Sequence, residues 1–526
     1  MLPSKLIHFS GSIAPSKLIP FSRLSAPGKL TGVNNMISLH KSIPRWLLLG
    51  AVAITLPGCS VGPNFKQPDP HVPAQWSATS TASSSINTDP QAVVNWWTTF
   101  QEPTLSSLIE RSTASNLDLR AAVLRITEAR AQREVASAAF LPTASANASY
   151  TRQRLSDTTT TGAVFTSFGN VTIPGAPAIN FPNPYNQFQL GASASWELDL
   201  FGRVRRSVEA ANADLQASVE DQHAVLVSLC ADVARNYVEL RGAQLRKEVT
   251  DRSLATQKEL YDLTRQRQAV GLTTDLDVAT AGAQLDSTQA LVPQLDREVT
   301  QDINQLSLLM GRAPDTLRAE LESARPVPQV PPVLPIGLPS DLARRRPDIR
   351  ESESRLHAAT ARIGVAVGDL FPKLTLTASG GTQSQSSSDL LKWASRFGSI
   401  GPTFEMPIFD GSRWATVRLQ NVRAQEAALD YERTVLSALH EVENALAAYK
   451  SDRERGVSLA SAVEKSRDAL NLARERYSSG VANFIDVLDA ERSLQQNELA
   501  LATNTTAIST DLVAIYRALG GGWEAA

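Results

Sequence analysis

The chain contains the stretch Trp196-Glu197-Leu198-Asp199-Leu200-Phe201-Gly202, and a related stretch, Phe404-Glu405-Met406-Pro407-Ile408-Phe409-Asp410-Gly411, follows in its second half. The glycines that close the two stretches are 209 residues apart, and the same distance separates Gly271 from Gly480 and Gly311 from Gly520. Pro142 and Pro372, upstream, are 230 residues apart. These offsets indicate that the chain contains two copies of one structural unit. The segment between the proline and the first of these glycines is about 21 residues shorter in one copy than in the other.

Each copy contains a proline-free stretch that predicts one very long helix. Gly202 to Gly271 and Gly411 to Gly480 each span 69 residues, which corresponds to a helix of roughly 100 Å. Apolar residues recur in both with the spacing of coiled coils. They are Leu215, Val219, Leu226, Leu229, Val233 and Leu240 in the first copy, and Val422, Leu429, Leu436, Leu439 and Leu446 in the second.

Shorter helices are expected on both sides of each long one. After a break at each glycine, a return helix of about 39 residues should end at Gly311 or Gly520. Helices of roughly 40 to 45 Å are expected over 113–140 and 341–370. These lengths suggest one long helix beside two shorter helices stacked end to end.

Strands are expected between the upstream helix and the long helix of each copy. Apolar and polar residues alternate there, as in strands of a membrane β-barrel, and predict strands at about 142–156, 186–200, 372–383 and 397–408. Four strands cannot close a barrel, two chains would give eight strands around a filled interior, and three would give twelve strands and a lumen. The predicted fold is therefore mainly α with a small transmembrane β part, in which coiled-coil hairpins of two repeats form a trimeric α-barrel joined to a trimeric β-barrel.

The composition excludes several kinds of chemistry. A formal net charge of −2 over 526 residues argues against a nucleic-acid-binding protein. No apolar run reaches the roughly 18 residues of a spanning helix, and no Gly-x-x-x-x-Gly-Lys-Ser/Thr loop could bind a nucleotide. Histidines and cysteines lack metal-ligand spacing, so we expect no catalytic residue, no metal, no cofactor and no enzyme activity. Cys230 lies in an apolar helical stretch and is predicted to be a buried thiol.

The N-terminal region is typical of an export and lipidation signal. Lys41 and Arg45 precede a short apolar run that ends at Leu56-Pro57-Gly58-Cys59. Small residues before a cysteine resemble the lipobox of bacterial lipoproteins, in which Cys59 would become the first residue and carry covalent lipid. Ser60, which follows, favours the outer membrane by resemblance to lipoprotein sorting rules. We expect translation to begin at Met36, because prolines interrupt residues 1–35.

Four stretches carry a family resemblance: Cys59-Ser60-Val61-Gly62-Pro63-Asn64-Phe65, Asn95-Trp96-Trp97-Thr98-Thr99-Phe100, Leu338-Pro339-Ser340-Asp341-Leu342-Ala343-Arg344-Arg345-Arg346-Pro347-Asp348-Ile349 and Phe484-Ile485-Asp486-Val487-Leu488-Asp489-Ala490. Together with the repeat, they resemble the TolC-like outer-membrane factors, in the NodT-type lipoprotein branch that serves resistance-nodulation-division (RND) efflux pumps. The resemblance covers nearly all of residues 36–523. It implies a lipid-anchored homotrimer in the outer membrane that extends into the periplasm. It also implies a passive duct of a tripartite pump for drugs or other toxic small molecules, with a periplasmic adaptor (membrane fusion) protein and an inner-membrane RND transporter as partners.

The resemblance also assigns roles to the two helix turns. Asp486 and Asp489 match family positions of the periplasmic constriction, and Asp275 and Asp277 occupy the equivalent turn of the first copy. Carboxylate rings select cations in pores, although acids at helix N-termini are also favoured by the helix dipole alone. Some relatives carry an acid where this chain has Ala482. The turns expected to contact the adaptor are Gly271-Leu272-Thr273 and Gly480-Val481-Ala482.

Two alternatives to the efflux duct remain at this stage. One is an exit duct of a type I protein secretion system, and the other is a structural coiled-coil lipoprotein that tethers the outer membrane. The predicted domain organisation is a signal region 1–58 (signal peptide 36–58), a lipidated linker 59–103, a first efflux repeat 104–311, an equatorial linker 312–340, a second efflux repeat 341–520 and a tail 521–526.

Overall fold

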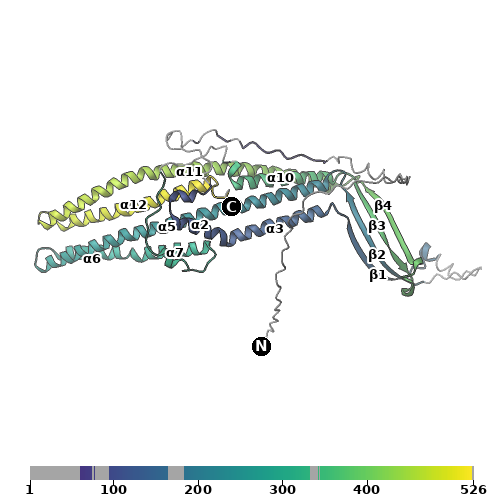
Figure 1. Cartoon of the computed structure of the whole chain (residues 1–526), viewed down its shortest axis with the longest axis horizontal. Helices are drawn as coiled ribbons and strands as arrows, with labels where there is room; N and C mark the ends of the chain where they lie inside the picture. Colours follow the sequence, from purple (N-terminus) through teal and green to yellow (C-terminus); the bar gives the residue numbers. More distant parts are fainter. Residues whose placement is uncertain are drawn as a thin grey trace, which may run out of the picture. The chain divides into compact units, whose positions relative to one another are not determined.

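The structure is a computed structural model that describes residues 60–70, 72–73, 76, 94–163, 183–331, 342 and 344–523. The chain divides into two compact units, Met1–Pro57 and Gly58–Ala526, and every described residue belongs to the second. The predicted signal region, Cys59 and parts of the predicted linkers and tail lie outside the described residues. Within the second unit, helices run side by side and a sheet continues from one end of them (Figure 1).

The two long helices are confirmed. Helix α5, Arg203–Ala269, has 67 residues, and helix α11, Gly411–Ser478, has 68. Both end at a glycine with a positive φ, 76° at Gly271 and 72° at Gly480. Glycine adopts this left-handed conformation without steric cost, which lets the chain reverse immediately after the helix.

The return helix matches the prediction in the second copy only. There, α12 runs unbroken over Phe484–Ala518. In the first copy, where one helix was expected, the structure has α6, Asp275–Gln289, and α7, Val292–Leu309. Pro293 explains why the predicted single helix is broken here. Proline has no backbone N–H donor and its ring clashes with the preceding turn, so it is tolerated only in the first turn of a new helix.

The upstream helices are shorter than predicted. Helix α3 covers Leu117–Ala138 and α10 covers Pro347–Gly368, 22 residues each. Asn116 separates α3 from the preceding α2, Pro103–Ser115, and caps α3 by accepting the Leu119 N–H. Proline at the first position of α10 sets its start. Helices α3, α6 and α7 pack on α5, whereas α10 packs against both α5 and α11, and α12 packs on α11 and α5.

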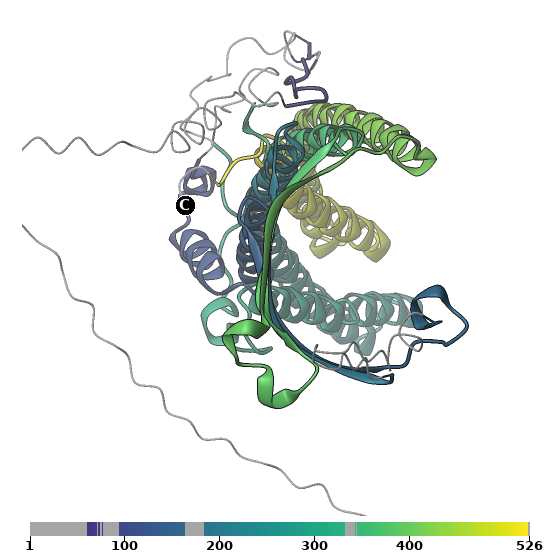
Figure 2. The same cartoon turned by 90° about the vertical axis from the view of Figure 1, so that its right-hand side faces the viewer.

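The four predicted strands form one antiparallel sheet in the order β1-β2-β3-β4. They are β1, Thr143–Gln153; β2, Tyr185–Leu198; β3, Lys373–Ser384; and β4, Arg396–Glu405. The central pair joins the two repeats, with Leu198 opposite Leu374. Strands β1 and β4 are the sheet edges, and the sheet is curled with a concave and a convex side (Figure 2).

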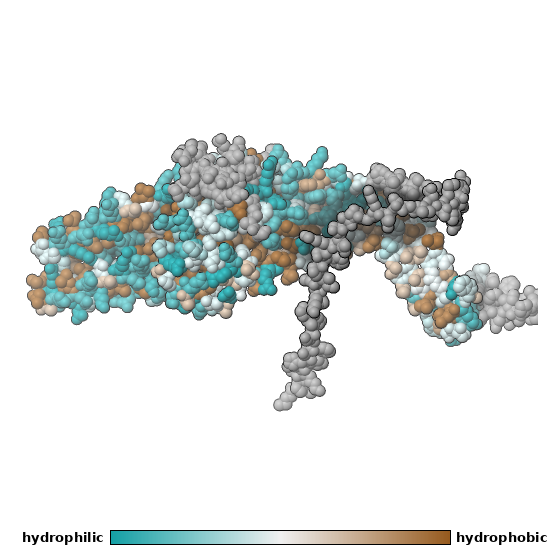
Figure 3. Space-filling view, viewed as in Figure 1, coloured by the Kyte–Doolittle hydropathy of each residue, from teal (hydrophilic) through white to brown (hydrophobic). Residues whose placement is uncertain are grey.

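The coiled-coil stripe is packed in α5 but not along most of α11. Leu226, Leu229, Val233 and Leu240 are buried in a core to which helices α2, α5, α7, α11 and α12 contribute. In α11, by contrast, Val422 is 52% exposed and Leu429 66% exposed. Hydrophobic residues accordingly appear between hydrophilic ones on the visible surface of the helices (Figure 3).

The structure bears on two further predictions, the burial of Cys230 and the lack of a membrane-spanning helix. Cys230 is fully buried, as predicted, and burial raises the pKa of its thiol to about 12. No helix in the described ranges combines the length and the apolar character needed to cross a membrane.

Candidate functional site: the two helix turns

The predicted adaptor-contact turns lie at the end of the helices that is remote from the sheet (Figure 1). They present apolar side chains to solvent. Leu272 is 74% exposed and Val481 is 68% exposed, and Val270, Leu276 and Ile485 next to them are exposed as well. A Cβ atom added at Gly271 or Gly480 would meet no described atom within 4 Å other than its chain neighbours.

Two of the four candidate gate residues act as helix caps. Thr273 Oγ1 and the Thr274 N–H donate to the carboxylate of Asp277 at 2.7 and 3.0 Å, and these bonds hold the pKa of Asp277 below its ordinary value. Asp486 accepts the N–H of Asn483 at 3.2 Å in the same way. Both acids satisfy backbone donors that a helix N-terminus leaves unpaired.

The other two candidates differ in their surroundings. Asp275 accepts a hydrogen bond from Gln268 Nε2 at 2.8 Å. Asp489 is exposed and has no hydrogen bond or ion pair with any described residue. Of the four acids, Asp489 therefore has the carboxylate that is most available to ions.

A contact between the repeats ties the two turns together. The Arg267 guanidinium at the end of α5 stacks on the Tyr477 ring of α11, 4.4 Å from its centroid, and donates to the Tyr477 carbonyl at 3.2 Å. Tyr477 in turn packs edge-on against Phe484 of α12. A small core of Leu260, Ala281, Leu470, Val487 and Leu488 surrounds this contact.

Buried polar side chains continue the contact between α5 and α12. Ser253 Oγ donates to Glu491 at 3.0 Å, and Gln257 Nε2 donates to Gln495 at 3.3 Å. Glu491 is 3% exposed, and burial raises the pKa of its carboxyl group. Its only described cationic partner, Arg474, is 3.7 Å away.

These inter-repeat contacts were not predicted from the sequence. Arg267 and Tyr477 lie in the aligned stretches Arg265–Gly271 and Arg474–Gly480, so the repeat itself was the available signal. No pattern in the sequence indicates that Glu491 and Gln257 are buried, because a polar residue on a long helix is exposed more often than buried.

The segment that follows Cys59 has a defined place. Ser60 lies against Gly202, and the Val61 N–H donates to the Phe201 carbonyl at 3.1 Å. The buried Arg206 donates to the carbonyls of Val61 and Gly62 and to Asn64 Oδ1. We call residues 60–67 the N-terminal strap, and it begins where β2 passes into α5.

Among the described residues, no group of three or more histidine, cysteine, aspartate or glutamate side chains could hold a metal ion. The features at the two turns are instead carboxylates, apolar surface and inter-helix contacts. They suit a passage for ions or solutes or a docking site for another protein.

Comparison with known proteins identifies the family. The model of the family described as "Outer membrane efflux protein" matches residues 108–312 and 338–521. The chain belongs to the outer membrane efflux protein family. It is 34% identical over 481 residues to the "Probable efflux pump outer membrane protein TtgC" of Pseudomonas putida, covering 91% of this chain and 95% of that protein. It is 30% identical to "Nodulation protein T" of Rhizobium leguminosarum bv. trifolii, over 90% of this chain and 96% of that protein.

A solved structure of the family has the same fold. The outer-membrane channel OprN superposes with a TM-score of 0.78 at 38% identity, covering 88% of this chain and 100% of that one. The chain is therefore an outer-membrane efflux protein with the TolC-like fold that the resemblance implied, from a family of channels rather than enzymes. The protein-secretion duct and the structural tether receive no support from these relatives.

Proposed function

We propose that three copies of this chain form a passive duct through the outer membrane, as the outer component of a tripartite efflux pump. The main support for the trimer is that the sheet ends in two edge strands, β1 and β4, each of which pairs with only one other described strand. Open edges in lipid leave backbone groups unsatisfied, so β4 of one copy pairs with β1 of the next until the barrel closes. Three copies supply enough strands for a lumen.

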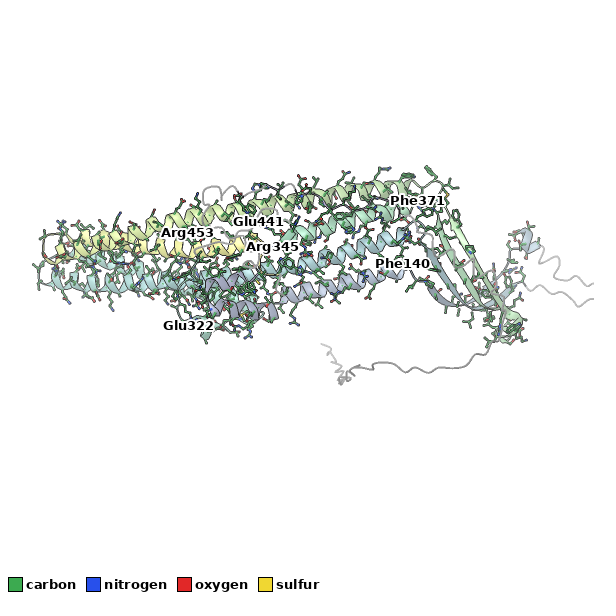
Figure 4. The ribbon with its side chains drawn as sticks, turned by 45° about the horizontal axis from the view of Figure 1, so that its top comes forward. Phe140, Glu322, Arg345, Phe371, Glu441 and Arg453 are labelled. Carbon is green, nitrogen blue, oxygen red and sulfur yellow. The ribbon has the colours of Figure 1, made fainter. Side chains whose placement is uncertain are left out.

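The internal repeat provides a template for the contact between copies. Within one chain, Phe201 at the end of the first strand pair stacks on Phe371 of the second repeat, with ring centroids 4.9 Å apart. The repeat equivalent of Phe201 is Phe409, and the position equivalent to Phe371 is Leu141, which directly follows Phe140. Phe409 is 95% exposed, Leu141 is 65% exposed and Phe140 is 40% exposed, and Phe140 lies where α3 leads into the sheet, away from Phe371 (Figure 4). We infer that Phe409 packs on Leu141 and the adjacent Phe140 of the neighbouring copy.

The helices support the same arrangement. Val422, Leu429 and Leu436 recur every seven residues on α11 and are exposed. Leu117 and Leu124 on α3 share that spacing and exposure. Within one chain, α10 lies between α5 and α11. Its repeat equivalent, α3, would lie in the same way between α5 of its own chain and α11 of the neighbouring copy. The exposed stripes of α3 and α11 would then cover each other.

Crosslinking tests this interface. The double variant Phe140→Cys with Phe409→Cys, treated with a short bismaleimide in membranes, should run as a covalent trimer. The matched control, Leu117→Cys with Phe409→Cys, places the first thiol at the far end of α3 and should remain monomeric. A monomer from the first pair, or a product no larger than a dimer at full reaction, would contradict the trimer.

We propose that Cys59 carries the lipid anchor. The strap supports this proposal, because its first residue, Ser60, lies at the base of the sheet, where membrane strands give way to helices. Mass spectrometry of the mature N-terminal peptide tests it: an acylated Cys59 is expected, and an unmodified thiol or a different first residue would contradict it.

At the opposite end we propose a cation-selective constriction and an adaptor contact. Asp489 is the principal gate carboxylate, with Asp486, Asp275 and Asp277 contributing through their position at the helix starts. The exposed turns Gly271-Leu272-Thr273 and Gly480-Val481-Ala482 dock a periplasmic adaptor, which joins the duct to an inner-membrane RND transporter. Crosslinkers at Leu272 and Val481 should capture the adaptor, whereas one at Arg252 on the side of α5 should not.

The cargo we propose is small molecules. The relatives include efflux pump proteins named for toluene and for antibiotics, and the chain offers no energy-coupling motif of its own. Transport is then driven by the partner pump, and the chain has neither enzyme activity nor a cofactor beyond the lipid on Cys59. Deleting its gene should lower the tolerated concentration of such compounds, and unchanged tolerance without a substitute duct would contradict the proposal.

A further inference from the structure

The sheet has two chemically different faces. Directly opposite residues share a face, so the register sorts the side chains into rows. One row contains Ser145, Ser193, Ser379 and Ser399, in which the first two hydroxyls and the last two are hydrogen-bonded at 2.9 and 2.8 Å. The adjacent row on the other face contains Ala144, Ala194, Ala378 and Ile400. In a membrane barrel the second face is the one turned to lipid.

Two arginines stand on this apolar face, both at the end of the sheet remote from the helices. Arg152 lies opposite Asn186, and Arg396 lies opposite Thr382. Both are exposed, and neither forms an ion pair with a described residue. A cation facing lipid is costly at the middle of the bilayer and is tolerated at its edge, where the guanidinium reaches the headgroups.

Aromatic and aliphatic side chains surround these cations. Tyr150 and Phe188 form a cross-strand pair on the same face, with centroids 4.8 Å apart. In the connection between β3 and β4, Leu391 and Trp393 are 79% and 78% exposed. The Arg396 guanidinium lies over the Trp393 ring, 3.5 Å from its centroid.

The β3–β4 connection has an ordered shape that holds these side chains outward. Ser395 Oγ donates to the Asp389 carbonyl at 2.7 Å, and Lys392 pairs with the Asp389 carboxylate. The connection lies on the convex side of the curled sheet (Figure 2). Its apolar side chains therefore stand on the side that a barrel turns to the membrane.

We propose that Arg152 and Arg396 bind the phosphate groups of lipid headgroups in the outer leaflet, with Trp393 and Tyr150 seated at the same depth. A guanidinium presents paired N–H donors that match phosphate oxygens, and aromatic rings concentrate at the boundary between hydrocarbon and headgroup. The site would fix the height of the barrel in the membrane. The proposal rests on the proposed function in one respect, the insertion of the sheet with its apolar face outward.

Lipid binding to the full chain in detergent, followed by native mass spectrometry, tests the proposal. The probes are phosphatidylglycerol, which is anionic, and phosphatidylcholine, which is zwitterionic. Arg152→Gln with Arg396→Gln should weaken phosphatidylglycerol binding about 30-fold, the value for two cations at an anionic lipid surface. Phosphatidylcholine binding should fall much less, because its choline cation offsets the charge of its phosphate. The matched control is Arg252→Gln, which removes an exposed guanidinium from α5 far from the sheet, and it should bind both lipids as the wild type does.

Other outcomes separate the alternatives. The conservative pair Arg152→Lys with Arg396→Lys should retain much of the preference for phosphatidylglycerol. Unchanged binding by the glutamine variant, or an equal loss in Arg252→Gln, would overturn the proposal, as would complete displacement of the lipid by millimolar inorganic phosphate. Conductance in planar bilayers separates a failure of the lipid site from a failure of the proposed duct. The glutamine variant should still conduct. A wild-type chain that does not conduct contradicts the proposed duct and not the lipid site.

Discussion

The guanidinium of Arg267 in the first repeat stacks on the ring of Tyr477 in the second, 4.4 Å from its centroid. It also donates to the Tyr477 carbonyl at 3.2 Å, so one side chain joins the ends of α5 and α11. Both partners lie one turn before the glycines that end these helices. Any separation of the two turns must break this contact.

Arg267→Ala should therefore loosen the end of the duct. The change removes a cation–π contact and a charge-assisted hydrogen bond, together about 1–2 kcal/mol of coupling between the repeats. Single-channel conductance in planar bilayers should increase. The control is Arg265→Ala, because the guanidinium of Arg265 lies over Tyr261 of its own helix. Equal conductance of Arg267→Ala and the wild type would show that this contact does not restrict the passage.

Asp489 and Asp277 should give different results when neutralised. Asp489→Asn removes an unpaired carboxylate and should shift the cation-to-anion permeability ratio toward one, because carboxylate rings attract cations. Asp277→Asn weakens a helix cap, with a cost of about 1 kcal/mol in local stability, and should alter proteolysis at the α5–α6 turn more than selectivity. Reversal potentials in a salt gradient measure the first effect. Unchanged selectivity in Asp489→Asn would remove this residue from the gate.

The free energy of unfolding should depend on pH through the pair Asp511 and Asp452. Burial and the neighbouring carboxylate of Asp452 raise the pKa of Asp511 from 3.8 to about 6. The folded chain therefore keeps a proton that the unfolded chain releases. Stability contributed by this group should fall as the pH rises from 3.8 to about 6 and stay lower above that range.

Asp511→Asn isolates this effect. The variant should lose part of the pH dependence and gain stability relative to the wild type at pH 8, measured by denaturant unfolding in detergent. Burial raises the pKa of Asp302 to about 7 and adds a second step of the same sign, so variant and wild type are compared at each pH. A constant difference between them from pH 4 to pH 8 would contradict the assignment.

Arg206→Ala should release the N-terminal strap. Arg206 is 3% exposed and donates to Val61, Gly62 and Asn64. Its loss removes three hydrogen bonds from a charged donor and should cost about 3 kcal/mol. Hydrogen exchange over residues 60–67 should become fast, whereas Gln67→Ala, which removes one exposed hydrogen bond to Glu353, should change it little. Full protection in Arg206→Ala would mean that other contacts hold the strap.

Local patterns in the sequence predicted the elements well where a pattern repeats along the chain. The long helices followed from proline-free stretches between equivalent glycines, and the strands followed from alternation of apolar and polar residues. The break at Pro293 was overlooked, although proline's effect on a helix is local and could have been applied. These features depend on neighbouring residues, which is why the sequence alone determined them.

Contacts between distant segments were decided only by the tertiary structure. The carboxylates of Asp277 and Asp486 cap their helices, which the sequence left as an alternative to the gate, and the carboxylate of Asp489 pairs with no residue that the structure describes. The α5 stripe is buried at Leu226, Leu229, Val233 and Leu240, whereas the stripe predicted on α11 is exposed at Leu429 and Leu436. Periodicity determines which face of a helix is apolar, but the partner of that face depends on where segments hundreds of residues apart come together. The repeat aligns the stretches that contain Arg267 and Tyr477, but the stacking of their side chains was decided by how the folded chain brings α5 and α11 together.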